Sequence, residues 1–213
     1  MTALSNEPGA PGRAEGTGAR TATIRRTTRE TDVAVSLDLD GSGVASIATG
    51  IGFFDHLLTS MAHHGLFDVE ITATGDLHVD EHHTVEDVAL VLGSAFAAAL
   101  GDRAGIVRFG DASVPMDEAL ATAVVDVGGR PYAVIDLPFR GERAGDLPLQ
   151  LVEHALEAFA RTAGATLHAR GTGRNDHHLA EAAFKALGRA LRAACEQDPR
   201  RVGTVASTKG VLG

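Results

Sequence analysis

The stretch that decides the fold is "NDHHLAEAAFKALG", residues 175–188, because the chain carries nearly the same pattern earlier, as "DEHHTVEDVALVLG", residues 80–93. Each copy has two adjacent histidines, a glutamate three residues after the second histidine, and Leu-Gly six residues after the glutamate. A pattern that returns within one chain indicates an internal repeat.

Other landmarks recur in the same order around the two copies. The recurring pairs are Glu30 and Glu118, Asp38 and Asp126, Gly41 and Gly129, and His56 and His154. We therefore infer a duplication, with a first repeat at about residues 21–110 and a second at 111–206. Residues 1–20, rich in Gly, Ala and Pro, are predicted to be a disordered lead-in, and residues 207–213 a C-terminal tail.

Local periodicity predicts a strand-strand-helix-strand-helix unit in each repeat. "DVAVSLDLDG" and "LATAVVDVGG" are rich in β-forming residues and end in turn residues, and "LFDVEITATGD" and "GATLHARGTG" are further strands closed by glycine. After each histidine pair the apolar residues recur at helical spacing, and Asp80 and Asn175 or Asp176 could cap these helices. The expected fold class is α/β, with each half burying one sheet face against two helices.

Composition limits the possible functions. A chain of 213 residues can bury a sizeable core, and a formal charge of −9 argues against binding to a nucleic-acid backbone. The single cysteine, Cys195, cannot form an internal disulfide, which favours an intracellular protein. The longest nearly apolar run, residues 88–100, is too short to span a bilayer, and the first residues lack the apolar core of a signal peptide. We expect a cytoplasmic protein without membrane or nucleic-acid partners.

The histidine pairs have the spacing of metal ligands. Residues four apart share one face of a helix, so His82 with Glu86, and His177 with Glu181, can each hold one ion. The second histidine of each pair, His83 or His178, points elsewhere and could serve another ion. His56 and His154 would complete two equivalent sites of three imidazoles and one carboxylate. Such donors suit Mn, Fe or Zn.

A second group of residues is basic and suggests an anion site. Arg108 and Arg130 lie in turns, Lys185 lies on the second metal helix, and "STKG" near the C-terminus supplies Ser207 and Lys209. Several cations in an acidic chain are most simply explained by a bound phosphate. The zincin pattern H-E-x-x-H is absent, so the sequence gives no support for metalloprotease chemistry.

The motifs together resemble one family. "GFFDHLL…HHG", "HHTVEDVALVLG", "RFGDASVPMDE", "GGRPY", "HHLAEAAFKALGRAL" and "STKG" are similar to those of imidazoleglycerol-phosphate dehydratase, over about residues 21–210. The resemblance implies a duplicated α/β sandwich, in which each half is a β-β-α-β-α type unit with a four-stranded mixed sheet and two helices on one face, like ribosomal protein S5 domain 2. It also implies trimers that assemble into a 24-mer, with two Mn ions per subunit at the subunit interfaces.

The resemblance also assigns roles to residues. The implied metal ligands are His56, His82, His83, Glu86, His154, His177, His178 and Glu181. The implied phosphate ligands are Arg108, Arg130, Lys185, Ser207 and Lys209, with His64 on the substrate side and Glu30 as the acid/base. Many relatives have Asp-Gln where this chain has Thr59 and Ser60, and "DLPFRGERAGDLPLQ", residues 136–150, is a variable stretch to which no role is transferred.

The implied reaction is a Mn-dependent dehydration in histidine biosynthesis, from D-erythro-imidazole glycerol phosphate to imidazole acetol phosphate. A Mn-bound imidazolate would expel the neighbouring hydroxyl, and a carboxylate would then remove the C2 proton. Glu30 is the candidate for that carboxylate, and Glu181 is the alternative. Two other functions stay open: a metal-bound shell or storage protein without catalysis, and a metal-dependent phosphoester hydrolase.

Overall fold

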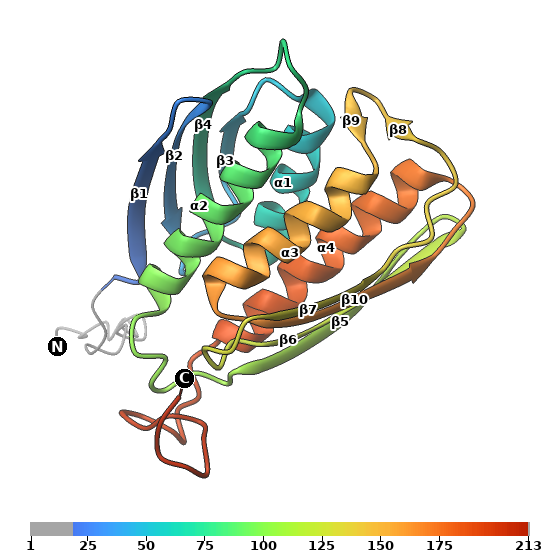
Figure 1. Ribbon diagram of the computed structural model, residues 1–213. Coiled ribbons are helices and arrows are strands. Elements are labelled where there is room, and N and C mark those ends of the chain that lie inside the picture. The colour runs from blue at the N-terminus through green and yellow to red at the C-terminus, as the bar shows by residue number, and fades with distance from the viewer. Residues whose placement is uncertain (1–18, 213) are drawn as a thin grey trace, which may run out of the picture.

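The computed structural model describes residues 19–212 and shows two halves built on one plan (Figure 1). The first half contains β1 (Thr21–Thr27), β2 (Thr31–Asp38), β3 (Ala45–Ala48), α1 (Gly52–Gly65), β4 (Asp68–Gly75) and α2 (His82–Leu100). The predicted disordered lead-in lies outside the described residues, except for its last two positions, Ala19 and Arg20. Arg20 is ordered by hydrogen bonds to Asp40 and to the carbonyl oxygen of Cys195.

The second half repeats this order. It contains β5 (Phe109–Met116), β6 (Ala119–Asp126), β7 (Tyr132–Asp136), α3 (Gln150–Ala163), β10 (Thr166–Thr172) and α4 (Asp176–Cys195), with a small hairpin, β8 (Arg143–Ala144) and β9 (Leu147–Pro148), before α3. We still propose two repeats as the organisation of the chain. Since β5 crosses the boundary predicted at residue 110, we place the start of the second repeat at Phe109.

Each half forms a four-stranded mixed sheet, which confirms the expected fold class. The strand orders are β1-β2-β4-β3 and β5-β6-β10-β7, and only the last pair in each sheet is parallel. The third strand in each half, β3 or β7, precedes the first helix and was not recognised from periodicity. Both are short edge strands, and β3 has only four residues, so alternation is weak evidence there.

The helices form the middle of the molecule, between the two sheets (Figure 1). Helices α1 and α2 cover the first sheet and α3 and α4 cover the second, while α2 packs against α3 and α1 against α4. The Leu-Gly that ends each copy of the opening motif explains this close packing. A Cβ on Gly93 would lie 2.2 Å from Thr162 Oγ1 of α3, and one on Gly188 would lie 2.2 Å from the Met61 carbonyl oxygen of α1.

The core is continuous through the helix layer. Phe54, Phe96 and Leu57 are fully buried there, and the inward residues of β2, such as Val33 and Val35, are also fully buried. By length and composition α2 could cross a membrane, but 67% of its most apolar 18-residue stretch is buried inside the protein. Helix α2 is therefore a core helix, as predicted for its apolar run.

Candidate metal centres and anion pocket

The first group of candidate ligands, cluster I, joins α2 to α3. It consists of His82 and Glu86 on α2 and His154 on α3, whose ligand atoms all lie within 4.8 Å of one another. His154 Nε2 is 3.6 Å from Glu86 Oε1, and Arg161 of α3 donates to the same oxygen at 3.0 Å. The α2 pair is one helical turn apart, as the sequence predicted.

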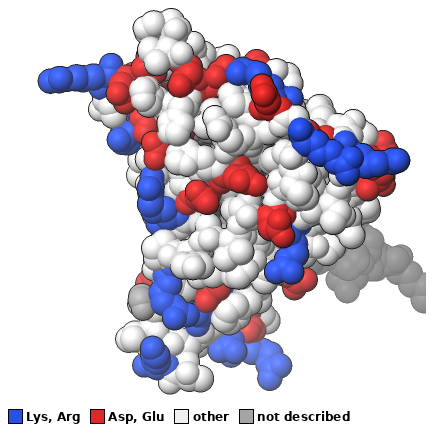
Figure 2. Space-filling model, turned by 45° about the vertical axis from the view of Figure 1, so that its right-hand side comes forward, with Lys and Arg blue, Asp and Glu red and all other residues white. Residues whose placement is uncertain are grey.

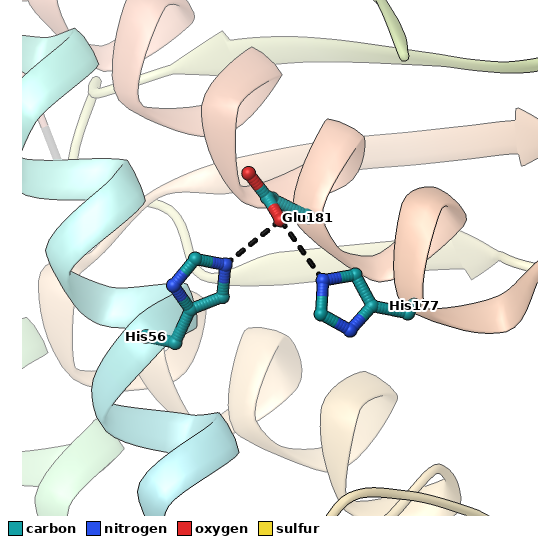
Figure 3. Close-up of side chains that lie close together, drawn as sticks. All are labelled: His56, His177 and Glu181. Atoms are coloured by element: carbon teal, nitrogen blue, oxygen red, sulfur yellow. Dashed lines mark hydrogen bonds and ion pairs between the residues drawn. The ribbon is translucent and has the colours of Figure 1, made fainter. Parts of the chain in front are cut away.

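The second group, cluster II, joins α1 to α4 (Figure 3). His56 Nε2 lies 2.8 Å and His177 Nε2 3.2 Å from the same oxygen of Glu181. Lys185 Nζ is 2.6 Å from the other oxygen, and Glu181 is 7% exposed. Burial raises the pKa of Glu181, but hydrogen bonds from His56 and Lys185 outweigh burial and lower the pKa to about 2. Glu181 is therefore an ionised acceptor at neutral pH.

Each cluster combines ligands from both halves of the chain. His154 of the second half completes the cluster of α2, and His56 of the first half completes the cluster of α4. The sequence left this pairing open. It follows from the helix layer, in which each motif helix packs against the first helix of the opposite half.

Both clusters have the donors of a metal site. They offer imidazole nitrogens and carboxylate oxygens without thiolate, a set that suits several divalent ions. His154 Nε2 is buried and has no hydrogen-bond partner, although it faces Glu86. A buried polar atom without a partner is costly, and a bound cation would remove that cost.

His83 and His178 point away from these clusters, as predicted. His83 Nδ1 lies 3.0 Å from Asp76 and 3.9 Å from Glu30, and His178 Nδ1 lies 3.0 Å from Glu118. The hydrogen bond to Asp76 raises the pKa of His83. A histidine whose Nδ1 is held by a carboxylate is oriented to use Nε2 as a ligand. Neither histidine reaches a cluster of its own chain among the described residues.

Capping fixes the start of both motif helices. The Asn175 side chain accepts from the backbone N–H groups of His177 and His178, and Asp80 accepts from that of His82. These contacts confirm Asn175 as the N-cap of α4. The N-cap of α2 is Glu81, whose side chain does not cap the helix, and Asp80 binds the first N–H of α2 from one residue further back. Asp176 instead accepts from the backbone N–H groups of Arg140 and Gly141.

Four of the five predicted phosphate ligands gather at one pocket. Arg108, Arg130, Ser207 and Lys209 line a cavity of about 370 Å³ beside the C-terminal tail. Figure 2 shows several basic side chains near the lower end of the molecule, where Figure 1 places this tail. The Arg108 guanidinium donates twice to Asp126 and once to the Ala206 carbonyl oxygen, so it also holds the tail in place.

The remaining predicted substrate residues lie elsewhere in the subunit. Lys185 binds Glu181 of cluster II, and His64 of α1 lies close enough to Lys185 to be affected by its charge. Burial, followed by the positive charge of Lys185, lowers the pKa of His64. One chain therefore presents two separate groups of substrate-binding candidates.

Sequence reasoning missed several residues that contact these sites. Arg161 binds Glu86, Asp76 binds His83, and Phe53 packs against cluster II with its ring tilted relative to His177 and the two ring centroids 4.8 Å apart. Arg161 lies seven residues after His154 and so on the same helix face, a signal that could have identified it. Phe53 and Asp76 carry no such signal.

Comparisons with known proteins agree on one family. A family model described as imidazoleglycerol-phosphate dehydratase matches residues 49–191. Proteins of that name from Gluconacetobacter diazotrophicus and Chloroflexus aggregans are 56% and 58% identical over 195 residues, which is 91% of this chain and 98% and 95% of theirs. A crystal structure of the Pyrococcus furiosus enzyme is similar with a TM-score of 0.77 at 39% identity, covering 89% of this chain and 100% of the other. The Staphylococcus aureus structure has a TM-score of 0.75 at 35% identity, covering 83% and 99%.

Proposed function

Because this chain belongs to the imidazoleglycerol-phosphate dehydratase family, we propose that it converts imidazole glycerol phosphate to imidazole acetol phosphate in histidine biosynthesis. The chain is a hydro-lyase, and its small substrate is phosphorylated. The observation that supports the proposal most strongly is the presence of two crossed His-His-Glu clusters and a pocket of basic residues in one subunit.

The proposed cofactor is Mn, with two ions per subunit. The clusters would each supply three ligands, His82, Glu86 and His154 to one ion and His56, His177 and Glu181 to the other. When bound, Mn would supply positive charge that favours the imidazolate form of the substrate ring. The absence of thiolate and the unpartnered Nε2 of His154 support a cation at these positions.

Glu30 is the proposed acid/base. Its carboxylate would accept the proton from C2 of the substrate, while the C3 hydroxyl leaves as water after taking up a proton; the resulting enol then becomes the ketone. Glu30 is half-exposed at the β1–β2 turn, 3.9 Å from His83. It is therefore close to a candidate ligand and accessible to a substrate. Glu118, its counterpart, is bound by His178 and two backbone N–H groups.

The phosphate is proposed to bind in the cavity lined by Arg130, Ser207 and Lys209. Arg108 would contribute charge while keeping its bonds to Asp126 and Ala206. Lys185, which binds Glu181 of cluster II, and His64, which is affected by the charge of Lys185, would reach the substrate from a neighbouring subunit. This division accounts for their distance from the cavity in a single chain.

Assembly through trimers to a 24-mer, with Mn at the interfaces, is part of the proposal. The orientation of His83 and His178 away from their own clusters supports it, because each could complete a site in another subunit. A cytoplasmic location is also proposed. It is supported by the single cysteine, Cys195, which is buried.

One assay tests the function directly. The purified protein should form ketone from imidazole glycerol phosphate, lose that activity in chelator, and regain it with Mn. Phosphate release instead of ketone formation would identify a phosphoester hydrolase. Tight metal binding without either product would favour a storage or scaffold protein.

A further inference from the structure

The connection between β7 and α3, residues 137–149, distinguishes the second half from the first. The corresponding connection between β3 and α1 comprises only residues 49–51. The longer segment includes the β8–β9 hairpin and is anchored by Leu147 and Leu149, which are almost fully buried. We call residues 137–149 the brace.

The brace contacts the starts of three helices that carry candidate metal ligands. The Asp146 carboxylate accepts from the backbone N–H groups of Gly52 at 2.6 Å and Phe53 at 2.9 Å, at the start of α1. Arg143 donates to Glu81, immediately before His82 of α2, at 2.5 Å. The backbone N–H of Gly141 donates to Asp176, the first residue of α4, at 2.7 Å. One segment thus connects the elements of both clusters.

Asp146 provides a helix cap that α1 lacks locally. The residue before α1 is Ile51, whose apolar side chain cannot cap the helix. Burial raises the pKa of Asp146, but the N–H groups of Phe53 and Gly52 outweigh burial and lower it. An ionised carboxylate at a helix N-terminus satisfies free N–H groups and the helix dipole. The start of α1 is therefore fixed by a residue of the opposite half.

Phe53 carries this restraint to cluster II. Its ring centroid lies 4.8 Å from that of His177 and 6.1 Å from that of His56. Phe53 also lies against the brace, since a Cβ on Gly145 would be 3.3 Å from Phe53 Cβ. The Phe53 side chain is therefore close both to the brace and to the two imidazoles.

We propose that Asp146 is a positioning residue for cluster II, which fixes the imidazoles of His56 and His177 through the start of α1 and the ring of Phe53. This inference rests on the proposed function, since it assumes that cluster II holds a metal ion. Partners that orient metal ligands typically change metal affinity by about 10- to 100-fold when they are removed. Cluster I should be unaffected by Asp146, because among the described residues no hydrogen bond, ion pair or ring contact joins its ligands to Asp146 or Phe53.

The test is a Mn titration of the purified full-length protein, followed by the electron paramagnetic resonance of free and bound Mn. His56→Ala and His82→Ala identify the binding events of cluster II and cluster I. Asp146→Ala should weaken only the cluster II event, by about 10- to 100-fold. Asp146→Asn, which keeps one carbonyl acceptor, should restore part of that affinity, and Glu70→Ala, which removes an exposed carboxylate on β4, should change neither event.

Phe53→Leu gives an independent measurement if Asp146→Ala fails to fold, and it should also weaken the cluster II event. Normal Mn affinity at cluster II in Asp146→Ala or in Phe53→Leu would overturn the inference, as would equal weakening of both events. If His56→Ala and His82→Ala both bind Mn like the wild type, the proposed metal sites are wrong and the inference fails with them. If those two variants lose their events and Asp146→Ala does not, only the inference fails.

Discussion

The β1–β2 turn of the first half and the β5–β6 turn of the second half carry equivalent glutamates in different surroundings. In the first, β1 ends at Thr27 and β2 begins at Thr31, so residues 28–30 form the turn and Glu30 remains half-exposed. In the second, Met116 pairs with Ala119, and the tight turn at Asp117 and Glu118 holds Glu118 against His178. Duplicated positions can therefore keep a residue type and change its chemistry.

A buried carboxylate in α2 accounts for part of this difference. Asp87 forms a hydrogen bond with Thr31 and an ion pair with Arg26, so it ties the β1–β2 turn to α2. The equivalent residue on α4 is Ala182, which has no polar side chain. The longer turn of the first half is thus held by a contact that the second half lacks, while Glu118 is held directly.

The largest effect is expected from exchanging the two glutamates for glutamine. Glu30→Gln should lower kcat by about 10²- to 10⁴-fold, the usual contribution of an acid/base group, with little change in KM. Glu118→Gln should lower kcat less, because Glu118 orients His178 and its pKa of about 2 makes it a poor base. Steady-state kinetics at saturating Mn measures both variants. An equal or larger loss in Glu118→Gln would reverse the assignment.

The second prediction tests whether His83 and His178, which point away from the clusters of their own chain, serve as metal ligands in another subunit. His83→Ala and His178→Ala should each lower the affinity for Mn at least about tenfold, and each should also reduce formation of the proposed 24-mer. Metal analysis and sedimentation of the same samples measure the two properties together. A metal-loaded assembly of normal size from either variant would contradict ligand sharing between subunits.

The buried contact at Asp87 should have a smaller effect, on stability and on the turn. Asp87→Ala should lower the free energy of unfolding by about 1.5–3 kcal/mol, because it removes hydrogen bonds to a charged group. Asp87→Asn, which can still accept from Thr31, should lose less. Denaturant unfolding of the metal-free protein measures this difference, and Ala182→Ser provides a matched polar change in α4. Identical stabilities for Asp87→Ala and the wild type would remove Asp87 as the anchor of the turn.

The smallest expected effect is on the stability of the protein at acidic pH. Hydrogen bonds from His178 and from the backbone of Asn175 and Arg174 lower the pKa of Glu118 from its ordinary value of 4.5 to about 2. Its contribution to stability is therefore complete above about pH 4.5 and is lost as the pH falls toward 2. Glu118→Gln should make the unfolding free energy less dependent on pH in this window. Denaturant unfolding of the metal-free wild type and Glu118→Gln between pH 5 and 2 measures this dependence. If the unfolding free energy depends equally on pH in the two proteins, the hydrogen bonds proposed to stabilise ionised Glu118 contribute nothing.

Much of the fold was predictable because its signals are local. The duplicated spacing, the helical stripes after each histidine pair and the alternating strands depend on residues close in sequence. For the same reason the pairs His82 with Glu86 and His177 with Glu181 could be placed on single helix faces. The short strands β3 and β7 were missed because edge strands of this length have little periodicity.

By itself, the sequence determined the duplication, the fold class, and the residue types available to bind a metal and a phosphate. Only the tertiary structure decided which half completes each cluster, that Lys185 lies with Glu181 rather than in the cavity of Lys209, and that Asp146 caps α1. These outcomes depend on contacts between segments far apart in the chain. Such contacts are set by how the helix and sheet faces pack, and no local spacing of residues encodes that packing.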